Sequence, residues 1–174
     1  MDKAPGPDGF TGRFYRSAWS IIKGDIIRAF DAISAMDCRS FHHVNEDTDD
    51  CALCAQEIET IDHLLIGCVV SRETWHRVFQ EVRLQTLTPQ VEGPLAEWWI
   101  HNRKRIPKAI RKGFDSLVWL VAWSLWLERN RRVHERSALM PVALASKILE
   151  EARIWARAGF GGISALLDSR AVRS

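Results

Sequence analysis

Four potential metal ligands within eighteen residues constrain the fold of this chain more than any other feature. The stretch CALCAQEIETIDHLLIGC has the spacing C-x2-C-x8-H-x4-C, formed by Cys51, Cys54, His63 and Cys68. Three thiolates and one imidazole suit the tetrahedral geometry of structural zinc sites, and a C-x2-C pair can supply two sulfurs from one tight turn. The alternative is a set of buried or reactive thiols beside a core histidine, but the spacing favours zinc. Because protein side chains fill all four positions, we expect a structural site.

The residues around this array predict its local structure. Thr60 is expected to cap a short helix whose apolar side faces the rest of the domain. His63 would then come from the first turn of this helix and Cys68 from its far end. The sequence therefore predicts a small Cys/His zinc module packed on helices.

The same stretch resembles the zinc-binding domain at the C-terminal end of plant LINE-type (non-LTR) retrotransposon reverse transcriptases. That family has C-x2-C, then Glu-Thr or Glu-Ser before His-Leu, then a closing Cys, as in C-A-L-C, E-T-I-D-H-L-L and G-C here. Trp75 and the block WSLWLERNRR at residues 123–132, which is like the family's W-x-L-W-x-x-R-N-x-R helix, extend the resemblance over about two-thirds of the chain. It implies a zinc site at the array and an ancestral role in holding RNA or target DNA near the polymerase.

The N-terminal stretch carries a second resemblance to the same enzymes. The turn-forming sequence KAPGPDGF at residues 3–10 is similar to the entry of their fingers region, which lies near template and incoming nucleotide. The resemblance associates Lys3 and Asp8 with that role. It continues through MDCRSFHHVNE and stops past Asn45.

Residues 11–35, between these two parts of the fingers resemblance, have the pattern of amphipathic helices. Gly24 allows a break into two helices, because glycine is unfavourable inside a helix. We expect the apolar side chains to face a core. They recur at helical spacing as Phe14, Ala18, Ile21, Ile22, Ile26, Ala29, Phe30 and Ile33.

A polymerase palm is missing between the fingers fragment and the Cys/His array. The palm holds two metal ions with paired carboxylates for phosphoryl transfer. The one adjacent aspartate pair, Asp49-Asp50, follows Asp47-Thr48 without a strand pattern, which indicates an acidic linker. The resemblance therefore implies a truncated retroelement product that is not an enzyme.

Apolar periodicity predicts a mainly α fold for the rest of the chain. Helices are expected over about 72–84, from residue 94 to about 105, from 107 to about 134, and from 141 to a stop at Gly159. The segment 117–127 is apolar on every side, so Trp119, Trp123 and Trp126 are expected in the core rather than as an exposed base-stacking platform. The predicted domains are the fingers fragment 1–46, the zinc-binding domain 47–159 and a loose tail 160–174.

A cluster of cations precedes the longest predicted helix. The net charge of +2 is too small to indicate nucleic-acid binding by itself, so local clustering has to carry that interpretation. Phosphate contacts with RNA or DNA are one hypothesis, and a solvated helix face is the other. A zinc-stabilised protein-interaction or structural domain is the alternative function, which a large exposed tryptophan patch would favour. The cluster comprises Arg103, Lys104, Arg105, Lys108, Arg111 and Lys112.

The cysteines and the apolar runs predict the cellular compartment in which the protein works. Three of the four cysteines belong to the array, and Cys38 is the fourth. This distribution is typical of metal binding in a reducing compartment rather than of a disulfide framework. The longest apolar run, Leu117 to Leu127, is short of the about twenty residues that cross a bilayer. We expect an intracellular protein, nuclear or cytoplasmic, without a membrane partner. Its oligomeric state stays open.

Overall fold

The computed structural model describes residues 50–90 and 93–168. Within these ranges the regular elements are helical, and β pairing is confined to an isolated bridge between Asp50 and Ile58. The prediction of a mainly α fold with a small Cys/His module packed on helices is confirmed. The fingers fragment at 1–46, with Lys3, Asp8, Cys38 and the helices expected within 11–35, lies outside the described residues.

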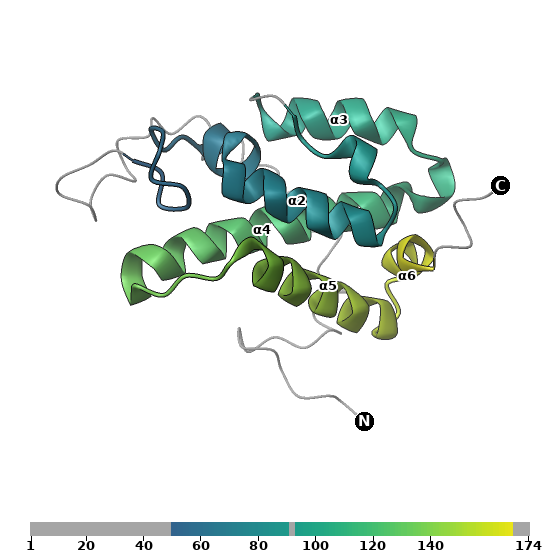
Figure 1. Cartoon of the computed structure of the whole chain (residues 1–174). Coiled ribbons are helices and arrows are strands. Elements are labelled where there is room, and N and C mark those ends of the chain that lie inside the picture. Colours follow the sequence, from purple (N-terminus) through teal and green to yellow (C-terminus); the bar gives the residue numbers. More distant parts are fainter. Residues whose placement is uncertain (1–49, 91–92, 169–174) are drawn as a thin grey trace.

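Helices α2 to α6 form the body of the domain (Figure 1). Short turns join them: a π-helical turn η2 and two 3-10 turns, η3 and η4. The bounds are η2 His63–Gly67, α2 Val69–Glu81, η3 Gln85–Leu87, α3 Leu95–Arg105, η4 Lys108–Ile110, α4 Arg111–Glu135, α5 Pro141–Arg157 and α6 Gly161–Leu167.

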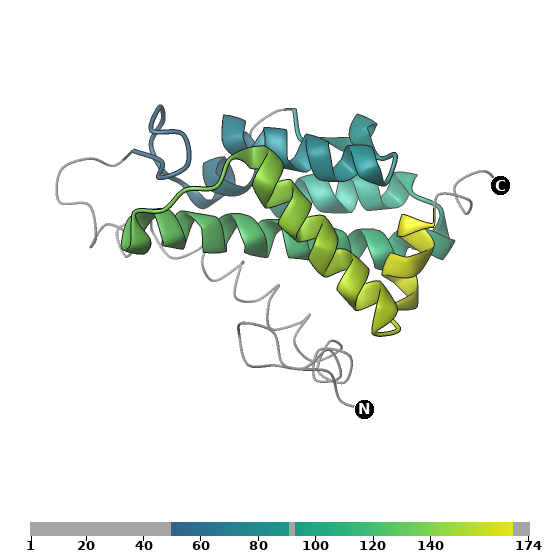
Figure 2. The same cartoon turned by 60° about the horizontal axis from the view of Figure 1, so that its bottom comes forward.

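Helix α4 is the central element of the domain. It has 25 residues and is therefore about 37 Å long at about 1.5 Å per residue. Every residue from Gly113 to Ala122 is buried, because α3, α5, α6 and η2 all pack on this helix. Figure 2 shows α5 lying obliquely across α4, with α6 beside the start of α4. This arrangement explains the segment's apolar character on every side.

An aromatic cluster joins α2, α3 and α4. Trp75 and Phe79 of α2 pack edge to face, with ring centroids 5.3 Å apart. Trp98 of α3 lies 5.2 Å from Trp75, and Phe114 of α4 lies 6.1 Å from Phe79. The indole Nε1 of Trp75 also donates a hydrogen bond to the carbonyl oxygen of Leu65 over 2.8 Å. That bond attaches the Cys/His module to the aromatic core through η2.

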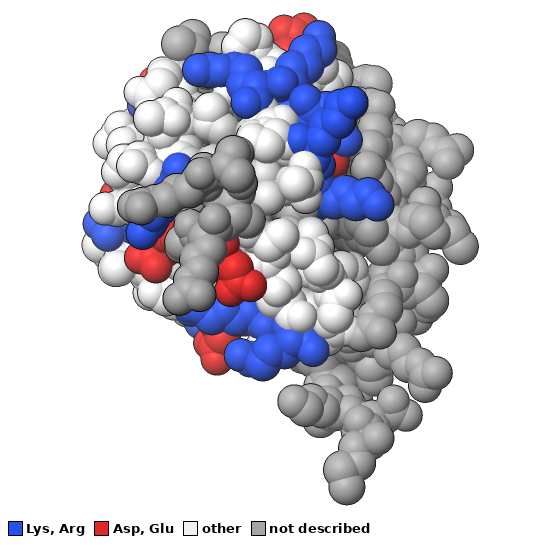
Figure 3. Space-filling model, turned by 90° about the vertical axis from the view of Figure 1, so that its right-hand side faces the viewer, with Lys and Arg blue, Asp and Glu red and all other residues white. Residues whose placement is uncertain are grey.

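A buried carboxylate holds the corner at which α3 leads into α4. Asp115 accepts hydrogen bonds from the indole of Trp99 over 2.9 Å and from Nε of Arg103 over 2.9 and 3.0 Å. The Asp115 side chain is buried, so the Arg103 guanidinium balances a charge that has little access to water. Figure 3 views the end of the molecule that contains this corner, and Lys and Arg side chains gather along its upper edge.

Helix α6 packs closely on the start of α4, because glycines meet there. A Cβ atom on Gly113 would lie 2.0 Å from the carbonyl oxygen of Gly162, and one on Gly162 would lie 2.8 Å from the amide nitrogen of Gly113. Ile163 and Leu166 of α6 are buried as a result. In the tail that is expected to be loose or weakly helical, residues 161–167 therefore form a packed helix. A seven-residue helix is too short to display a clear apolar period in the sequence.

Several helix boundaries follow the predicted signals, but α4 begins at Arg111, after the 3-10 turn η4, and not at the predicted residue 107. Helix α3 ends at Arg105, two residues before Pro107, and α5 begins at Pro141. The chain turns at Gly159, whose φ of 95° suits a residue without a side chain. Helix α2 begins at Val69 rather than at the predicted residue 72, and the hydroxyl of Ser71 within it donates to the carbonyl oxygen of Leu64.

The apolar middle of α4 is not buried along its whole length. Trp119 is buried as expected, but the prediction that Trp123 is a core residue is wrong, because half of its surface is exposed. Leu127, one turn further on, is 44% exposed. The neighbouring helices cover α4 on several faces and leave this one open.

None of the helices in the described ranges is both long enough and apolar enough to cross a membrane.

Candidate metal centre

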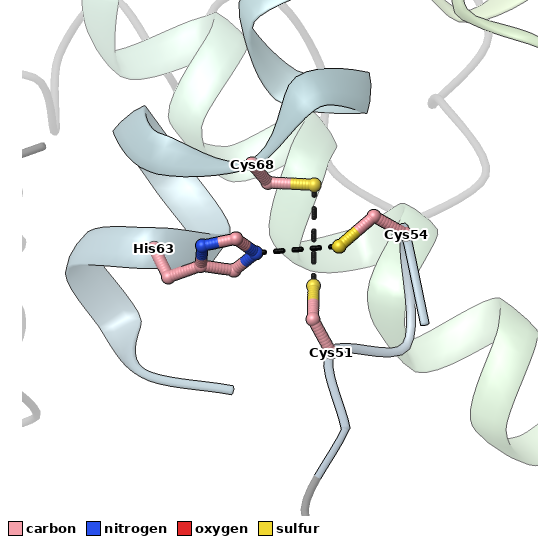
Figure 4. A group of neighbouring side chains, drawn as sticks. All are labelled: Cys51, Cys54, His63 and Cys68. Atoms are coloured by element: carbon pink, nitrogen blue, oxygen red, sulfur yellow. Dashed lines mark hydrogen bonds between the residues drawn. The ribbon is translucent and has the colours of Figure 1, made fainter. Parts of the chain in front are cut away.

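The structure brings the four predicted ligands to one point. The Sγ atom of Cys54 lies 3.4 Å from Nε2 of His63, and the Sγ atoms of Cys51 and Cys68 lie 4.0 Å apart. All four ligand atoms lie within 4.8 Å of one another, and their side chains converge on a common centre (Figure 4). The cluster can hold a metal ion.

Backbone hydrogen bonds shape the turn that carries the first two cysteines. The amide of Ala55 donates a hydrogen bond to the carbonyl oxygen of Cys51 over 2.7 Å. The amide of Cys51 donates one to the carbonyl oxygen of Glu57, also over 2.7 Å. Ala55 has a φ of 52°, so the chain reverses direction directly after Cys54. Both sulfurs therefore face the same side of the turn.

The other two ligands lie at the ends of η2. The hydroxyl of Thr60 accepts a hydrogen bond from the amide of His63 over 3.0 Å, so the predicted cap is confirmed. Cys68 directly precedes α2, and its amide donates to the carbonyl oxygen of His63 over 2.6 Å. The wider π turn thus sets the spacing between the imidazole and the last sulfur.

The two buried thiols, Cys51 and Cys68, have different pKa values. The thiol of Cys51 donates a hydrogen bond to Cys68, and this bond lowers the pKa of Cys68 to about 5. The same hydrogen bond raises the pKa of Cys51, and burial raises it further. In the absence of a metal, one sulfur of the pair is therefore a thiolate at neutral pH. Nδ1 of His63 lies 3.9 Å from the Glu57 carboxylate, which leaves Nε2 directed at the sulfurs.

Glu59 joins the Cys/His loop to α4. One carboxylate oxygen accepts from the amide of Ala52 over 3.0 Å, and the other accepts from Nε of Arg129 over 2.9 Å. Both partners of the ion pair are mostly buried. The loop is therefore anchored by a charged contact that water screens weakly.

Arg132 makes the second attachment between the Cys/His loop and α4. Its guanidinium donates to the carbonyl oxygens of Leu53, over 2.6 Å, and Leu139, over 2.9 Å. It also donates to the carboxylate of Glu128 over 2.9 Å, and Arg131 pairs with the other oxygen of that carboxylate. The fully buried Glu128 thereby fixes the arginine that holds the C-x2-C turn.

These roles of Arg129, Arg131 and Arg132 were not predicted from the sequence. One signal was present. Glu128 lies at the end of an otherwise apolar segment and is followed by three arginines within four residues. A carboxylate in that position must be paired if it is buried, and the i, i+4 spacing to Arg132 supplies a partner.

The predicted cation cluster divides into two groups. Arg103 and Arg111 have structural partners: Arg103 pairs with Asp115, and Arg111 donates to the carbonyl oxygens of Ile106 and Lys104. The other four side chains are exposed, and none makes an ion pair with the residues that the structure describes. These four, named here the cation corner, are Lys104, Arg105, Lys108 and Lys112.

The structure does not bring the cation corner and the metal centre together. Lys112 lies in the first turn of α4, and Arg129, which holds the Cys/His loop, lies near its other end. Seventeen residues separate them, which is about 26 Å along the helix. The two candidate sites therefore lie at opposite ends of the domain (Figure 1).

Fold and site together define a helical domain with a closed Cys3His cluster, which a buried ion pair and a hydrogen bond from Arg132 fasten to the longest helix. Comparisons of this chain with protein-family models, curated proteins and solved structures found no match. The retroelement resemblance therefore rests on the quoted motifs.

Proposed function

We propose that this chain is a zinc-stabilised helical domain that binds nucleic acid through phosphate contacts. The choice of zinc follows from the ligand set and its spacing. In a tetrahedron with thiolates at about 2.3 Å and imidazole at about 2.0 Å from the metal, sulfurs lie about 3.8 Å apart and a sulfur–nitrogen pair about 3.5 Å apart. Two of the six ligand pairs here lie at 4.0 and 3.4 Å, and all six lie within 4.8 Å.

Zinc in this cluster would have a structural role. It would join the C-x2-C turn, η2 and the start of α2, and binding to a site that forms on folding adds directly to the free energy of folding. Glu59 and Arg132 would orient the loop, because both hold its backbone from outside the ligand set. No ligand position is left for a substrate.

The cation corner is the observation that supports nucleic-acid binding. A chain with a net charge of +2 places four exposed cations at one corner, while Arg129 and Arg132 are engaged in buried pairs. Such a corner attracts phosphates, so the contacts would be mainly to the phosphate backbone rather than to base edges. We therefore expect weak, sequence-tolerant binding to RNA or DNA that falls with salt.

The contacts between the two sequence motifs support descent from a retroelement reverse transcriptase. The resemblance rests on two separate sequence blocks, C-x2-C…H…C and W-x-L-W-x-x-R-N-x-R. In the structure, Arg129 and Arg132 of the second block bind Glu59 and Leu53 in the Cys/His loop of the first. We propose that the domain derives from such an enzyme and has no polymerase activity, because its chain lacks the palm carboxylates.

Binding to labelled single-stranded RNA and duplex DNA at two or more salt concentrations tests the proposal. If about four phosphates are engaged, log affinity should fall against log salt with a slope of about −3 to −4. Changing Lys104, Arg105, Lys108 and Lys112 to Ala should weaken binding to all sequences and flatten the slope. Arg103 is left intact, because its loss would unpair the buried Asp115.

A matched control removes four exposed cations elsewhere. The control variant changes residues on α2 and α5 and lowers the net charge equally, so a general charge effect would appear in both variants. Equal binding by the two variants, or no binding by the unchanged protein at low salt, would rule out the cation corner as a nucleic-acid site. The control positions are Arg77, Lys147, Arg153 and Arg157.

A protein-interaction domain is the second candidate function. The half-exposed Trp123 and the neighbouring Leu127 on α4 favour it, because apolar side chains exposed together often mark an interaction surface. Absence of nucleic-acid binding would leave this function as the better interpretation.

A further inference from the structure

Two of the cysteines at the metal centre lie close enough to form a disulfide. The Sγ atoms of Cys51 and Cys68 are 4.0 Å apart, and both residues are fully buried. The sulfurs of a disulfide are about 2.05 Å apart, so these two need to approach by only about 2 Å. Cys51 belongs to the C-x2-C turn and Cys68 directly precedes α2, so a bond between them would join the same two parts of the domain as a metal ion does.

Contacts outside the ligand set hold the turn that carries Cys51. Glu59 accepts a hydrogen bond from the amide of Ala52, and Arg132 donates one to the carbonyl oxygen of Leu53. Neither contact uses a ligand side chain. The turn therefore keeps its attachment to α4 when the metal is removed, which limits how far the Cys51 sulfur can move.

The segment that leads to Cys68 is held in the same way. The indole of Trp75 donates a hydrogen bond to the carbonyl oxygen of Leu65, and the hydroxyl of Ser71 donates one to the carbonyl oxygen of Leu64. These bonds fasten η2 to α2 on both sides of Cys68 without a metal ligand. The dithiol is therefore preorganised by the helical body.

The third cysteine gives an oxidant access to this pair. Cys54 is partly exposed, whereas Cys51 and Cys68 are buried, and the three sulfurs lie within 4.8 Å of one another. A small oxidant such as hydrogen peroxide therefore meets Cys54 first. We propose that hydrogen peroxide converts the metal centre into a Cys51–Cys68 disulfide, with Cys54 as the thiol that it attacks and with loss of the metal.

The reaction balances in three steps. The Cys54 thiolate attacks one oxygen of hydrogen peroxide, the O–O bond breaks, and hydroxide leaves, which gives the sulfenic acid. The Cys68 thiolate attacks the Cys54 sulfur and expels a second hydroxide. The Cys51 thiolate then attacks the Cys68 sulfur, and Cys54 leaves as a thiolate. In sum, two thiolates lose two electrons and peroxide gains them. Two of the four ligands are consumed, so the chain no longer holds the metal.

Loop length and burial favour the Cys51–Cys68 bond over the alternatives. Cys51 and Cys68 are 17 residues apart, and closing a longer loop constrains the unfolded chain more than closing the three-residue step from Cys51 to Cys54. A disulfide that includes the partly exposed Cys54 is also open to reductants, because exposed disulfides are the labile ones. The inference rests on the proposed zinc site and is independent of nucleic-acid binding.

Peroxide treatment of the zinc-loaded, full-length chain tests the inference. A chromogenic chelator measures zinc release, and mass spectrometry of unreduced peptides maps the disulfide. We expect one zinc released per chain, a mass lower by two hydrogens and a bond between Cys51 and Cys68. Helix content by circular dichroism should be retained, and a dithiol reductant with added zinc should restore the loaded form. A protein that binds no zinc before treatment but forms this bond would contradict the proposed metal and support the dithiol.

Two matched variants compare the competing pairs. Cys54→Ser keeps Cys51 and Cys68, whereas Cys68→Ser keeps Cys51 and Cys54, and each variant lacks one ligand. Both also carry Cys38→Ser, so no further thiol competes. In a glutathione redox buffer, the disulfide of the first variant should form with an equilibrium constant about tenfold or more above that of the second.

Four results would overturn the inference. They are equal equilibrium constants in the two variants, a Cys51–Cys54 bond as the final product of the zinc-loaded chain, oxidation to sulfinic acid without a disulfide, and retention of zinc after peroxide treatment. The product map of the zinc-loaded chain decides the matter even if a variant fails to fold.

Discussion

The guanidinium of Arg132 donates a hydrogen bond to the carbonyl oxygen of Leu53 over 2.6 Å, although 79 residues separate them in the chain. Leu53 lies between the first two cysteines of the metal centre. The longest helix of the domain therefore holds the C-x2-C turn directly. Metal site and helical body are coupled through this contact and through the ion pair of Arg129 with Glu59.

Removing Arg132 should destabilise the domain strongly. In Arg132→Ala the fully buried Glu128 keeps only Arg131 as an ion-pair partner, and the Leu53 carbonyl oxygen loses its donor. Breaking a buried pair costs about 3 kcal/mol or more, which urea unfolding of the metal-loaded protein measures. Arg77→Ala is the matched control, because its exposed pair with Glu73 contributes about 0.5 kcal/mol or less. Equal losses in the two variants would contradict the role of Arg132.

Zinc should bind one per chain, and Cys54→Ser should abolish stoichiometric binding. Native mass spectrometry measures this directly, with Cys38→Ser as the control that keeps its metal. Chelation should raise amide hydrogen exchange within residues 51–68, because the cluster joins the turn to η2. The middle of α4 should stay protected, because it is buried by α3, α5 and α6. Undiminished zinc in Cys54→Ser would show that the ligand assignment is wrong.

Metal binding should release protons and weaken as the pH falls. At pH 7 the metal-free protein holds Cys68 as a thiolate, because its pKa is lowered to about 5, whereas the raised pKa of Cys51 keeps that group protonated. Binding requires both as thiolates, so the Cys51 proton must leave, and acid opposes this. Below about pH 5 Cys68 is protonated as well, and affinity should fall more steeply.

Calorimetric titration with zinc in buffers of different ionisation enthalpy counts the released protons, and competition titrations between pH 5 and 8 give the affinity trend. An affinity that does not change over this range would contradict the thiolate assignment.

The contact between α4 and α6 should not tolerate a side chain. In Gly113→Ala the new Cβ would lie 2.0 Å from the backbone oxygen of Gly162, so α6 must move away. Overpacking of this kind costs about 1–3 kcal/mol. Gly161→Ala is the control, because a Cβ there meets nothing within 4 Å. Thermal unfolding compares the two variants, and equal midpoints would show that the helices separate without cost.

Local signals predicted a large part of this structure. The ligand spacing identified the residues that meet at the metal centre, and Thr60 caps the turn that carries His63. Proline and glycine marked helix ends at Arg105, Pro141 and Gly159. These features depend on residues close together in the chain, so their physical causes are visible in the sequence.

The features that were missed depend on which helix faces meet. Arg103 pairs with Asp115 and Arg132 with Leu53 only because α3 and the Cys/His loop pack on particular sides of α4. A helix that is apolar on every side does not reveal which side stays open, so Trp123 was assigned to the core. The glycine contact at Gly113 likewise requires a partner backbone that periodicity cannot identify.

The length of α4 gives the domain a fixed internal spacing. Lys112 and Arg129 are about 26 Å apart along a rigid helix, which matches about eight base pairs of duplex DNA at about 3.4 Å each. A nucleic acid held at the cation corner would therefore be kept at a constant distance from the Cys/His loop, because the rigid helix α4 spans the interval between them.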